Sequence, residues 1–335
     1  SGPGLHRRGR GRGFEYLSEG GERVSDPQAL GRIHELAIPP AWREVWICAD
    51  PLGHLQATGF DAAGRKQYLY HPRWRQHRDR QKFERMRSFG ASLPKLRRHV
   101  AADLARDGLP RERVLGCAVR LLDVGMFRIG SEEYADDDGG LGLATIRREH
   151  VSVLEGAVAF DYPAKSGVQR AQVITDPQTF DLVAALARRR SGEPELLAYR
   201  QGRRWISLRS EEINDYLKSW LGAEFSAKDF RTWNATVMAA VSLATDGAGA
   251  SSKSSRKRAI DRSVRAVADL LGNTPAVARR SYIDPHIFDH DLDGNTIADT
   301  VKRIRDLDPA NDRVRARIER AVLPLLGTSA PRTTR

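Results

Sequence analysis

The periodicity of the sequence changes near residue 74, and this change limits the possible folds more than any other feature. Between Ile38 and Tyr70, short apolar and aromatic runs alternate with turn-forming stretches such as Asp50–Gly53 and Asp61–Gly64. Short runs bounded by Pro, Gly and Asp are typical of antiparallel strands. From Trp74 onward, Arg, Lys, Gln and Glu surround spaced apolar residues, which predicts helices. We therefore expect an α+β protein whose N-terminal domain, residues 14–76, is a small antiparallel β-sheet.

The remainder of the chain, residues 77–326, is predicted to be a mainly α-helical domain with one small β-hairpin or sheet. Alternating apolar residues over 150–175 predict a hairpin whose tip carries Lys165. Apolar spacing and Ser or Thr caps predict helices over Thr179–Arg190, Ser210–Leu221, Ser226–Thr245 and Arg256–Leu271. Composition predicts three segments without fixed structure: a flexible Gly- and Arg-rich arm over 1–13, a flexible Gly/Ser-rich connection over 246–258 and a disordered tail over 327–335.

The charge and length of the chain favour a folded protein that binds nucleic acid. The 335 residues include 55 Lys and Arg against 43 Asp and Glu, a net charge of +12, and 40% of the residues are hydrophobic. Excess cations on a chain with enough apolar residues for a core indicate a polyanionic partner. The sequence has no run of about eighteen apolar residues, so we expect no membrane partner. With only Cys48 and Cys117 and no signal peptide, we expect a reducing, cytoplasmic location.

The stretch from Leu271 to Asp284 contains a candidate nucleophile. Thr274 is a good helix N-cap, and Pro275 fits the first helical position, where its missing N–H has no intrahelical partner to lose. Tyr282 should then lie about two turns into this helix, with Arg279 on roughly the same face. A tyrosine followed by Ile is most often a half-buried packing residue, so a chemical role for Tyr282 depends on other residues.

Three basic residues have surroundings that are unusual for a surface charge. Arg128 follows an apolar helical pattern and stands near Gly130, which allows another group to approach closely. Lys165 is at the expected hairpin tip. Arg231 lies inside an otherwise core-like helix, where an unpaired charge would be expensive. Each of them, taken alone, also fits an ordinary solvated or salt-bridged residue.

Taken in chain order, Arg128, Lys165, Arg231, Asn273 and Tyr282 with their surroundings strongly resemble the type IB DNA topoisomerases, in particular the small bacterial and poxvirus-like branch. The resemblance extends to the N-terminal region, where the matching segments are Ile38-Pro-Pro-Ala-Trp42, Gly53-His-Leu-Gln-Ala57 and Gly64-Arg-Lys-Gln-Tyr-Leu-Tyr-His-Pro72. It covers the chain from about residue 20 to about residue 290, which makes it far more specific than any single motif.

The resemblance implies covalent catalysis. Tyr282 would attack a DNA phosphorus, giving a 3′-phosphotyrosyl link and a free 5′-hydroxyl strand. Arg128 and Arg231 would bind the non-bridging oxygens, and Lys165 would donate a proton to the departing 5′-oxygen. Most of the family has histidine where this chain has Asn273, and asparagine donates a hydrogen bond without carrying charge, so we expect oxyanion binding there. No metal, nucleotide or other cofactor is implied.

The resemblance also implies that the N-terminal sheet contacts the major groove of DNA. Gln67, Tyr68 and Tyr70 would face the bases, with Arg65 and Lys66 also in contact with DNA. A plain interpretation makes at least one of the two tyrosines a sheet-packing residue. We expect a monomer, associated with the bacterial nucleoid, that closes its two domains around double-stranded DNA as a clamp. The hinge of this clamp would be a linker near residues 73–80.

Two other classes of protein and one further motif were weighed against this interpretation. A tyrosine recombinase shares the Arg, Lys, Arg and Tyr chemistry, but recombinases usually have His three residues before the second arginine, where this chain has Lys228. They also have a helical rather than sheet-like DNA-binding domain. The other class is a non-catalytic basic DNA-binding protein.

Asp289–Gly294 copies the first half of a calcium loop, but its twelfth position is Thr300 and not Glu, which favours a polar turn over a metal site.

Overall fold

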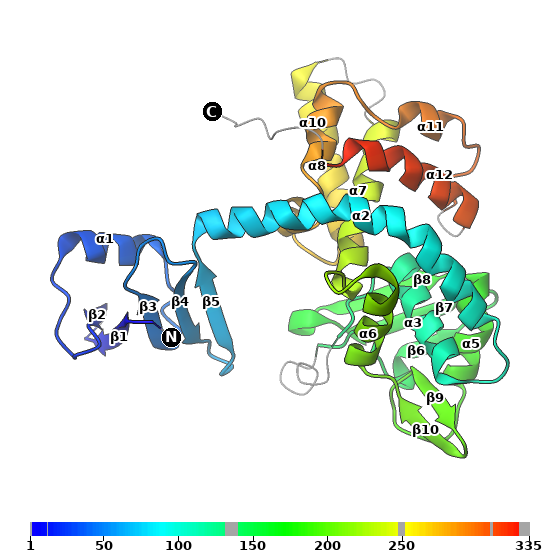
Figure 1. The fold of residues 1–335 in the computed structure, drawn as a ribbon, viewed down its shortest axis with the longest axis horizontal. Helices are drawn as coiled ribbons and strands as arrows, with labels where there is room; N and C mark the ends of the chain where they lie inside the picture. Colours follow the sequence, from blue (N-terminus) through cyan, green and yellow to red (C-terminus); the bar gives the residue numbers. More distant parts are fainter. Residues whose placement is uncertain (1, 12, 131–139, 247–251, 309–310, 328–335) are drawn as a thin grey trace. The chain divides into compact units, whose positions relative to one another are not determined.

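The computed structural model describes residues 2–11, 13–130, 140–246, 252–308 and 311–327, which belong to two compact units divided after Lys82 (Figure 1). Both units contain helices and strands, and the protein is of the α+β class, as the sequence predicts. The division falls beyond the expected boundary at residue 76.

The N-terminal unit is built on a five-stranded antiparallel sheet in the order β2-β1-β3-β4-β5. Its strands are β1 (Gly4–Arg10), β2 (Gly13–Leu17), β3 (Arg43–Cys48), β4 (Leu55–Phe60) and β5 (Lys66–Tyr70). Asp26 caps helix α1 (Pro27–Glu35), which brings Ile33 into a small core with Val45, Ile47 and Ala57. Because strand side chains alternate between the two faces of a sheet, Val45 and Ile47 lie on the same face of β3.

The expectation of a flexible arm over residues 1–13 is wrong. Gly4–Arg10 form strand β1, which pairs with β2 on one side and with β3 on the other. Arg7 donates a hydrogen bond of 2.6 Å to the Trp42 carbonyl. Gly4 lies so close to Trp46 that an added Cβ would be 2.0 Å from its indole nitrogen. A Gly- and Arg-rich composition therefore does not prevent strand formation where neighbouring strands supply the backbone hydrogen bonds.

The second unit is mainly helical (Figure 1). Its first helix, α2 (Pro72–Leu104), begins before the division between the units. Residues 73–80 were expected to form a linker and instead lie inside this helix, because neither Gly nor Pro interrupts them and their Arg and Gln residues favour helix. The other helices are α3 (Arg111–Gly125), α5 (Pro177–Ala187), α6 (Ser210–Leu221), α7 (Ala227–Asp246), α8 (Lys253–Leu271), α9 (Pro275–Ser281), α10 (His286–Leu292), α11 (Ala298–Lys302) and α12 (Asp312–Val322).

Two small antiparallel sheets accompany these helices. One has the order β6-β7-β8, formed by β6 (Val151–Val153), β7 (Val158–Pro163) and β8 (Gln169–Ile174). The other is the hairpin of β9 (Ala198–Gln201) and β10 (Arg204–Ser207). Short 3-10 helices are η1 (Arg148–His150), η2 (Lys165–Gly167) and η3 (Leu323–Leu325). Since η2 joins β7 to β8, the predicted hairpin with Lys165 at its tip is confirmed.

Helix α7 supplies the centre of the second unit's core. Phe230 and Trp233 are fully buried, and the Phe89 ring of α2 meets Phe230 edge to face at 5.1 Å. Gly90 faces the Trp233 ring so closely that an added Cβ would lie 2.1 Å from it. The absence of a side chain at Gly90 thus lets α2 pack directly on α7, and this packing fixes the helix that carries Arg231.

The expected bounds of α6 are confirmed, whereas α8 begins earlier than predicted. Lys253–Arg258, expected to belong to a flexible connection, form the first turns of α8 because the Ser252 side chain caps it, accepting from the backbone N–H of Ser255 at 3.1 Å. Asp289–Leu292, expected in a polar turn, are helical. Residues 247–251 and the expected tail, apart from Gly327, lie outside the described residues.

Candidate active site

Arg128 is positioned by a turn at the end of α3. Met126, the C-cap of that helix, has a left-handed conformation with φ of 53°, which redirects the chain. The Arg128 carbonyl then accepts a hydrogen bond of 2.8 Å from the backbone N–H of Leu143. A Cβ on Gly142 would lie 2.3 Å from the Gly130 nitrogen, so two glycines let these segments pack backbone to backbone. The predicted close approach at Gly130 is therefore present, and it holds the backbone of Arg128.

Arg231 is a buried charge that links three helices. Its side chain extends from α7, and the residue is 3% exposed. Its Nη2 donates to the carbonyl of Leu271, the last residue of α8, at 2.8 Å, and its Nη1 donates to the carbonyl of Met126, directly after α3. Carbonyls at helix C-termini lack intrahelical donors and carry partial negative charge, so they suit a guanidinium. Within the described residues, the buried Nε of Arg231 has no hydrogen-bond partner.

Tyr282 directly follows α9 and is 7% exposed. Thr274 and Pro275 begin this helix as predicted, but α9 ends at Ser281, so the tyrosine is its C-cap and not an internal residue. Thr236 of α7 fixes the backbone on both sides of the tyrosine. Its hydroxyl donates to the Tyr282 carbonyl at 3.3 Å and accepts from the backbone N–H of Asp284 at 3.1 Å.

Arg128 and Arg231 lie beside the Tyr282 side chain, and the charge of Lys228 also acts on it. Arg128 Nη1 donates to the tyrosine hydroxyl at 3.4 Å, and the Cζ atom of Arg231 lies 5.3 Å from the centroid of the ring. Arg279, expected on the same face as Tyr282, instead pairs with Asp261 at 3.8 Å and lies over the Phe288 ring. The expected position of Arg279 is therefore wrong, whereas Arg128 and Arg231 lie beside the tyrosine.

These charges change the acidity of the site. Burial raises the pKa of the Tyr282 hydroxyl, but the positive charges of Arg231 and Arg128 outweigh burial and bring the pKa below its ordinary value. Burial, together with repulsion from Arg128, lowers the pKa of Arg231 to about 10, so Arg231 is still cationic at neutral pH. A tyrosine that loses its proton more easily, beside two cations, has the properties that a nucleophile for an anionic substrate requires.

Asn273 lies in the turn between α8 and α9 and joins this group through Arg128. Arg128 Nη2 donates to Asn273 Oδ1 at 2.6 Å. The amide nitrogen of Asn273 is buried and, like the Nε of Arg231, has no hydrogen-bond partner in the described part of the chain. A buried donor without an acceptor is costly, and an anion bound at the site would satisfy both donors.

Lys165 is exposed on η2 and shares a cavity of about 170 Å³ with Arg128 and Arg231. Sequence reasoning did not single out Arg170, which also lines this cavity. Arg170 lies opposite Tyr162 in the β7–β8 hairpin and donates to the carbonyl of Leu270 at 2.8 Å. The predicted hairpin could have indicated Arg170. In a hairpin with Lys165 at its tip, a residue five positions after the tip pairs with the first strand, near the other residues of the cavity.

The expected DNA-contacting residues of the N-terminal unit do not all share one face. Tyr68 and Tyr70 are near each other, with ring centroids 6.1 Å apart, and Tyr70 stacks on Trp74 at 4.5 Å. Gln67 alternates to the other face of β5 and donates to Asp61 at 2.9 Å. Arg65 pairs with the same carboxylate at 2.8 Å. Lys66 alternates to the face of the two tyrosines. The exposed face of β5 therefore presents Lys66, Tyr68 and Tyr70.

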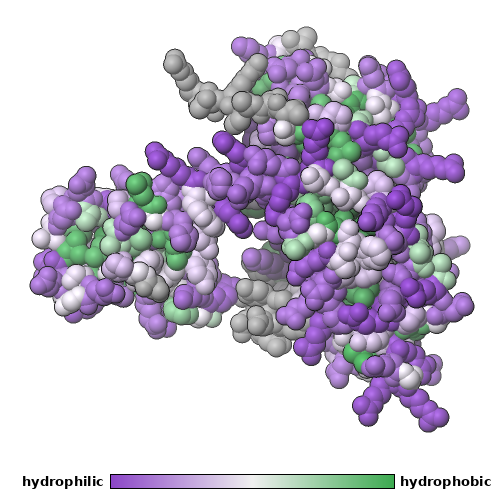
Figure 2. Space-filling view, viewed as in Figure 1, coloured by the Kyte–Doolittle hydropathy of each residue, from purple (hydrophilic) through white to green (hydrophobic). Residues whose placement is uncertain are grey.

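The surface in view is mainly hydrophilic, with hydrophobic residues in small patches (Figure 2). None of the helices that the structure describes is long and apolar enough to cross a membrane. Among the same residues, no group of three or more His, Cys, Asp or Glu side chains is arranged to hold a metal ion.

A tyrosine hydroxyl beside the buried guanidinium of Arg231 and the partly buried guanidinium of Arg128, with a lysine lining the same cavity as both arginines, is an arrangement suited to a phosphodiester substrate. Residues 71–306 match the family model described as the eukaryotic DNA topoisomerase I catalytic core, and residues 13–61 match that of the bacterial DNA topoisomerase IB N-terminal domain. Because the first match covers more than half of the chain, the protein belongs to the type IB DNA topoisomerases, which are isomerases that act on DNA.

Individual relatives agree with this assignment. DNA topoisomerase 1B of Acanthamoeba polyphaga mimivirus is 28% identical over 287 residues, which covers 84% of this chain and 85% of the viral protein. DNA topoisomerase 1 of Schizosaccharomyces pombe is 31% identical over 167 residues, 49% of this chain and 19% of the yeast protein. DNA topoisomerase 1 of Mycosarcoma maydis is 26% identical over 176 residues, 48% of this chain and 17% of the fungal protein.

Proposed function

We propose that this topoisomerase relaxes positive and negative supercoils by cutting one DNA strand through Tyr282 and then resealing it. The observation that carries the proposal is the Tyr282 hydroxyl, whose pKa is lowered beside Arg128 and Arg231. The tyrosine oxygen forms a bond to phosphorus while the bond from phosphorus to the 5′-oxygen breaks. The 3′-phosphotyrosyl ester that results conserves the energy of the broken ester, so resealing needs neither nucleotide nor metal.

Arg128 and Arg231 are proposed to bind the non-bridging oxygens as negative charge grows on them. Two buried donors support this role, the Nε of Arg231 and the amide nitrogen of Asn273, because neither has a hydrogen-bond partner in the described residues. Asn273 has a second role in this scheme. Its Oδ1 accepts from Arg128, and this contact orients the guanidinium toward the tyrosine. Asparagine thus serves as a donor to phosphate and as an orienting acceptor, without any change of charge.

Lys165 is proposed to protonate the departing 5′-oxygen, because it lines the cavity beside both arginines. Lys165→Ala should slow cleavage of a normal substrate strongly. The same variant should cleave a substrate with a 5′-thiolate leaving group almost as fast as the wild type, since a thiolate departs without a proton. Equal losses on the two substrates would refute the role of general acid.

The N-terminal unit is proposed to contact the same duplex through the face of β5 that carries Lys66, Tyr68 and Tyr70. Tyr68 is 47% exposed, which is unusual for a large aromatic residue and suits contact with bases. Gln67 and Arg65 are engaged by Asp61 and would have to release it to reach DNA. The proposed active form is a monomer, because a single chain brings Tyr282 together with Arg128, Arg231 and Asn273.

The test is a relaxation assay with supercoiled plasmid in EDTA, followed by denaturation to trap covalent adducts. Wild type should relax the plasmid and form an adduct at a 3′-phosphate, and Tyr282→Phe should do neither. Tyr199→Phe, which changes a tyrosine of β9, is the matched control and should retain activity. Adduct formation by Tyr282→Phe would refute the proposed nucleophile. Joining of strands between two specific sites would indicate a recombinase, and binding without an adduct would indicate a non-catalytic protein.

A further inference from the structure

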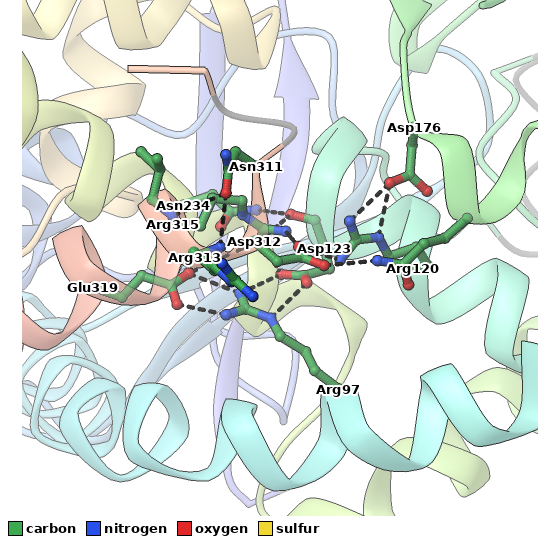
Figure 3. A network of polar contacts seen from close by, with 12 residues as sticks. Arg97, Arg120, Asp123, Asp176, Asn234, Asn311, Asp312, Arg313, Arg315 and Glu319 are labelled. Carbon is green, nitrogen blue, oxygen red and sulfur yellow. Dashed lines mark hydrogen bonds and ion pairs between the residues drawn. The ribbon is translucent and has the colours of Figure 1, made fainter. Parts of the chain in front are cut away.

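Helix α12 contributes three charged side chains to a polar network in the helical unit, two of them largely buried and one, Asp312, partly exposed (Figure 3). Asp312, Arg315 and Glu319 follow each other at intervals of three and four residues, so they lie on one face of the helix. The side chain of Glu319 is 8% exposed and that of Arg315 is 11% exposed. Asn311 caps the N-terminus of this helix, since its Oδ1 accepts a hydrogen bond from the backbone N–H of Arg313 at 3.0 Å.

These side chains belong to a network in which the charges are paired. Arg97 of α2 donates to both oxygens of Glu319, at 2.6 and 2.7 Å, and to both oxygens of Asp123, at 2.8 and 2.9 Å. Trp233 of α7 adds a hydrogen bond of 3.2 Å to Glu319. Burial raises the pKa of Asp123, but Arg315 and Arg97 outweigh burial and hold the pKa well below its usual range, so this carboxyl is ionised. The network thus joins α2, α3, α7 and α12 through paired charges, in which Arg315 Nη1 makes no hydrogen bond within the described residues and lies 3.6 Å from Asp312 Oδ1.

The contact that matters for the active site is made at the end of α3. The Asp123 carbonyl belongs to the last turn of that helix, where carbonyls lack intrahelical donors. It accepts from the amide of Asn234 at 2.8 Å and from Arg315 Nη2 at 3.3 Å, and the same nitrogen of Arg315 lies 2.6 Å from Asp123 Oδ1. Arg315 and Asn234 therefore cap α3 from two different helices, three residues before the left-handed residue Met126.

We propose that Arg315 of the C-terminal helix is a positioning residue for DNA cleavage, which holds the end of α3 and thereby the turn that aims Arg128 at the scissile phosphate. The inference rests on the role proposed above for Arg128. The turn needs external support because Met126 has a positive φ, which is unfavourable for a residue with a side chain. Arg231 supports the turn at the Met126 carbonyl, and Arg315 supports the helix that leads into it.

Removing Arg315 should lower the free energy of unfolding, because Asp123 loses one of its two arginine partners, but the protein should still fold. Asp123 keeps its two hydrogen bonds to Arg97, so no buried carboxylate loses its only partner. Its carbonyl keeps the amide of Asn234. The expected result is a looser α3 end within a folded protein. Because a displacement of about 1 Å in a catalytic group can cost about a hundredfold in rate, Arg315→Met should slow cleavage by about tenfold to a hundredfold.

The experiment compares Arg315→Met with Arg128→Ala in single-turnover cleavage by the full chain. One DNA duplex has a normal scissile phosphate, and a second has a methylphosphonate there, tested as each separated diastereomer. The methylphosphonate lacks one charged oxygen, so it depends less on a correctly placed Arg128. Both variants should therefore show a smaller loss on methylphosphonate DNA than on normal DNA, with non-covalent DNA affinity unchanged. Arg315→Lys, which retains a donor for Asp123, should recover part of the rate.

Arg320→Met is the matched control, because Arg320 is exposed on the same helix, and it should cleave like the wild type. The inference is overturned if Arg315→Met cleaves like Arg320→Met, or if its loss is equal on the two substrates, as a simple decrease in folded enzyme would give. A wild-type rate for Arg128→Ala would refute the proposed role of Arg128 itself. If Arg128→Ala cleaves slowly while Arg315→Met cleaves like the wild type, only the positioning role of Arg315 is refuted.

Discussion

Arg231→Lys should keep the positive charge at the site and still lose most of the cleavage activity. The guanidinium of Arg231 presents nitrogens in three directions, two of them toward the carbonyls of Met126 and Leu271. The third, Nε, is buried and has no hydrogen-bond partner in the described residues, which leaves it available to a phosphate oxygen. A lysine ammonium is one nitrogen on a flexible stem, so it cannot hold both helix ends and also present a fixed donor to the substrate.

The expected loss of cleavage rate follows from the number of these contacts that each variant loses. Loss of one preorganised donor to a developing oxyanion raises the barrier by about 2.7–4 kcal/mol, a rate loss of about 10² to 10³. Alanine also removes the charge, so Arg231→Ala should lose more than Arg231→Lys. The free energy of unfolding should also decrease in these variants, since a hydrogen bond to a charged group contributes about 1.5–3 kcal/mol to stability. Lysine can retain one of the two bonds to the helix ends, and alanine retains neither.

The assay is single-turnover cleavage of a labelled duplex with enzyme in excess. It is run at a temperature where thermal unfolding curves show that each variant is fully folded. Under these conditions the rate reports the chemical step and not the folded fraction. A rate for Arg231→Lys within about threefold of wild type would show that charge alone is needed. That result would refute the argument from the directions of the three nitrogens.

Three further predictions follow from the described contacts. Asn273→His should remain active, because imidazole can also donate to phosphate, and a relaxation assay that shows a loss as large as that of Arg231→Ala would contradict the assignment. The phenolate of Tyr282 should form at a lower pH than that of an ordinary tyrosine, and Arg128→Ala should move this titration to higher pH because the variant removes a stabilising cation. Ultraviolet difference titration against Tyr282→Phe measures both, and an unshifted titration in Arg128→Ala would contradict the electrostatic cause. Arg97→Met should lower the free energy of unfolding by about 3–5 kcal/mol, because it leaves two buried carboxylates with fewer partners; chemical denaturation that shows less than about 1 kcal/mol would contradict this.

The sequence was most informative where a local signal and the final environment agree. Thr274 and Pro275 begin α9 because capping and a fixed φ act within one turn of chain. The bounds of α6 and the hairpin that carries Lys165 were likewise predictable from periodicity. The five residues of the proposed chemistry were found through resemblance. The structure brings Arg231, Asn273 and Tyr282 together around Arg128, and Lys165 lines a cavity that Arg128 also lines.

Features that depend on distant partners were not predictable. Strand β1 has a composition typical of a flexible arm, and it is ordered by hydrogen bonds to β2 and β3. Arg279 has the right spacing to face Tyr282, but Asp261 and Phe288 attract it instead. The pairing of Arg315 with Asp123 spans most of the chain, and no local pattern reports it. In each case the deciding contact comes from residues that only the tertiary fold brings close.

The hydrogen-bond partners described for Arg128 and Arg231 share one property, which is that all of them are neutral oxygens. They are a tyrosine hydroxyl, an amide oxygen and two backbone carbonyls. Neutral acceptors orient a guanidinium without neutralising it. An incoming phosphate therefore has no carboxylate to displace from these contacts, and the full charge of both arginines is available at the moment of binding. The free enzyme is thus ready to bind an anion. The repulsion between the two arginines lowers the free energy of unfolding, and it does not have to be overcome again in each catalytic cycle.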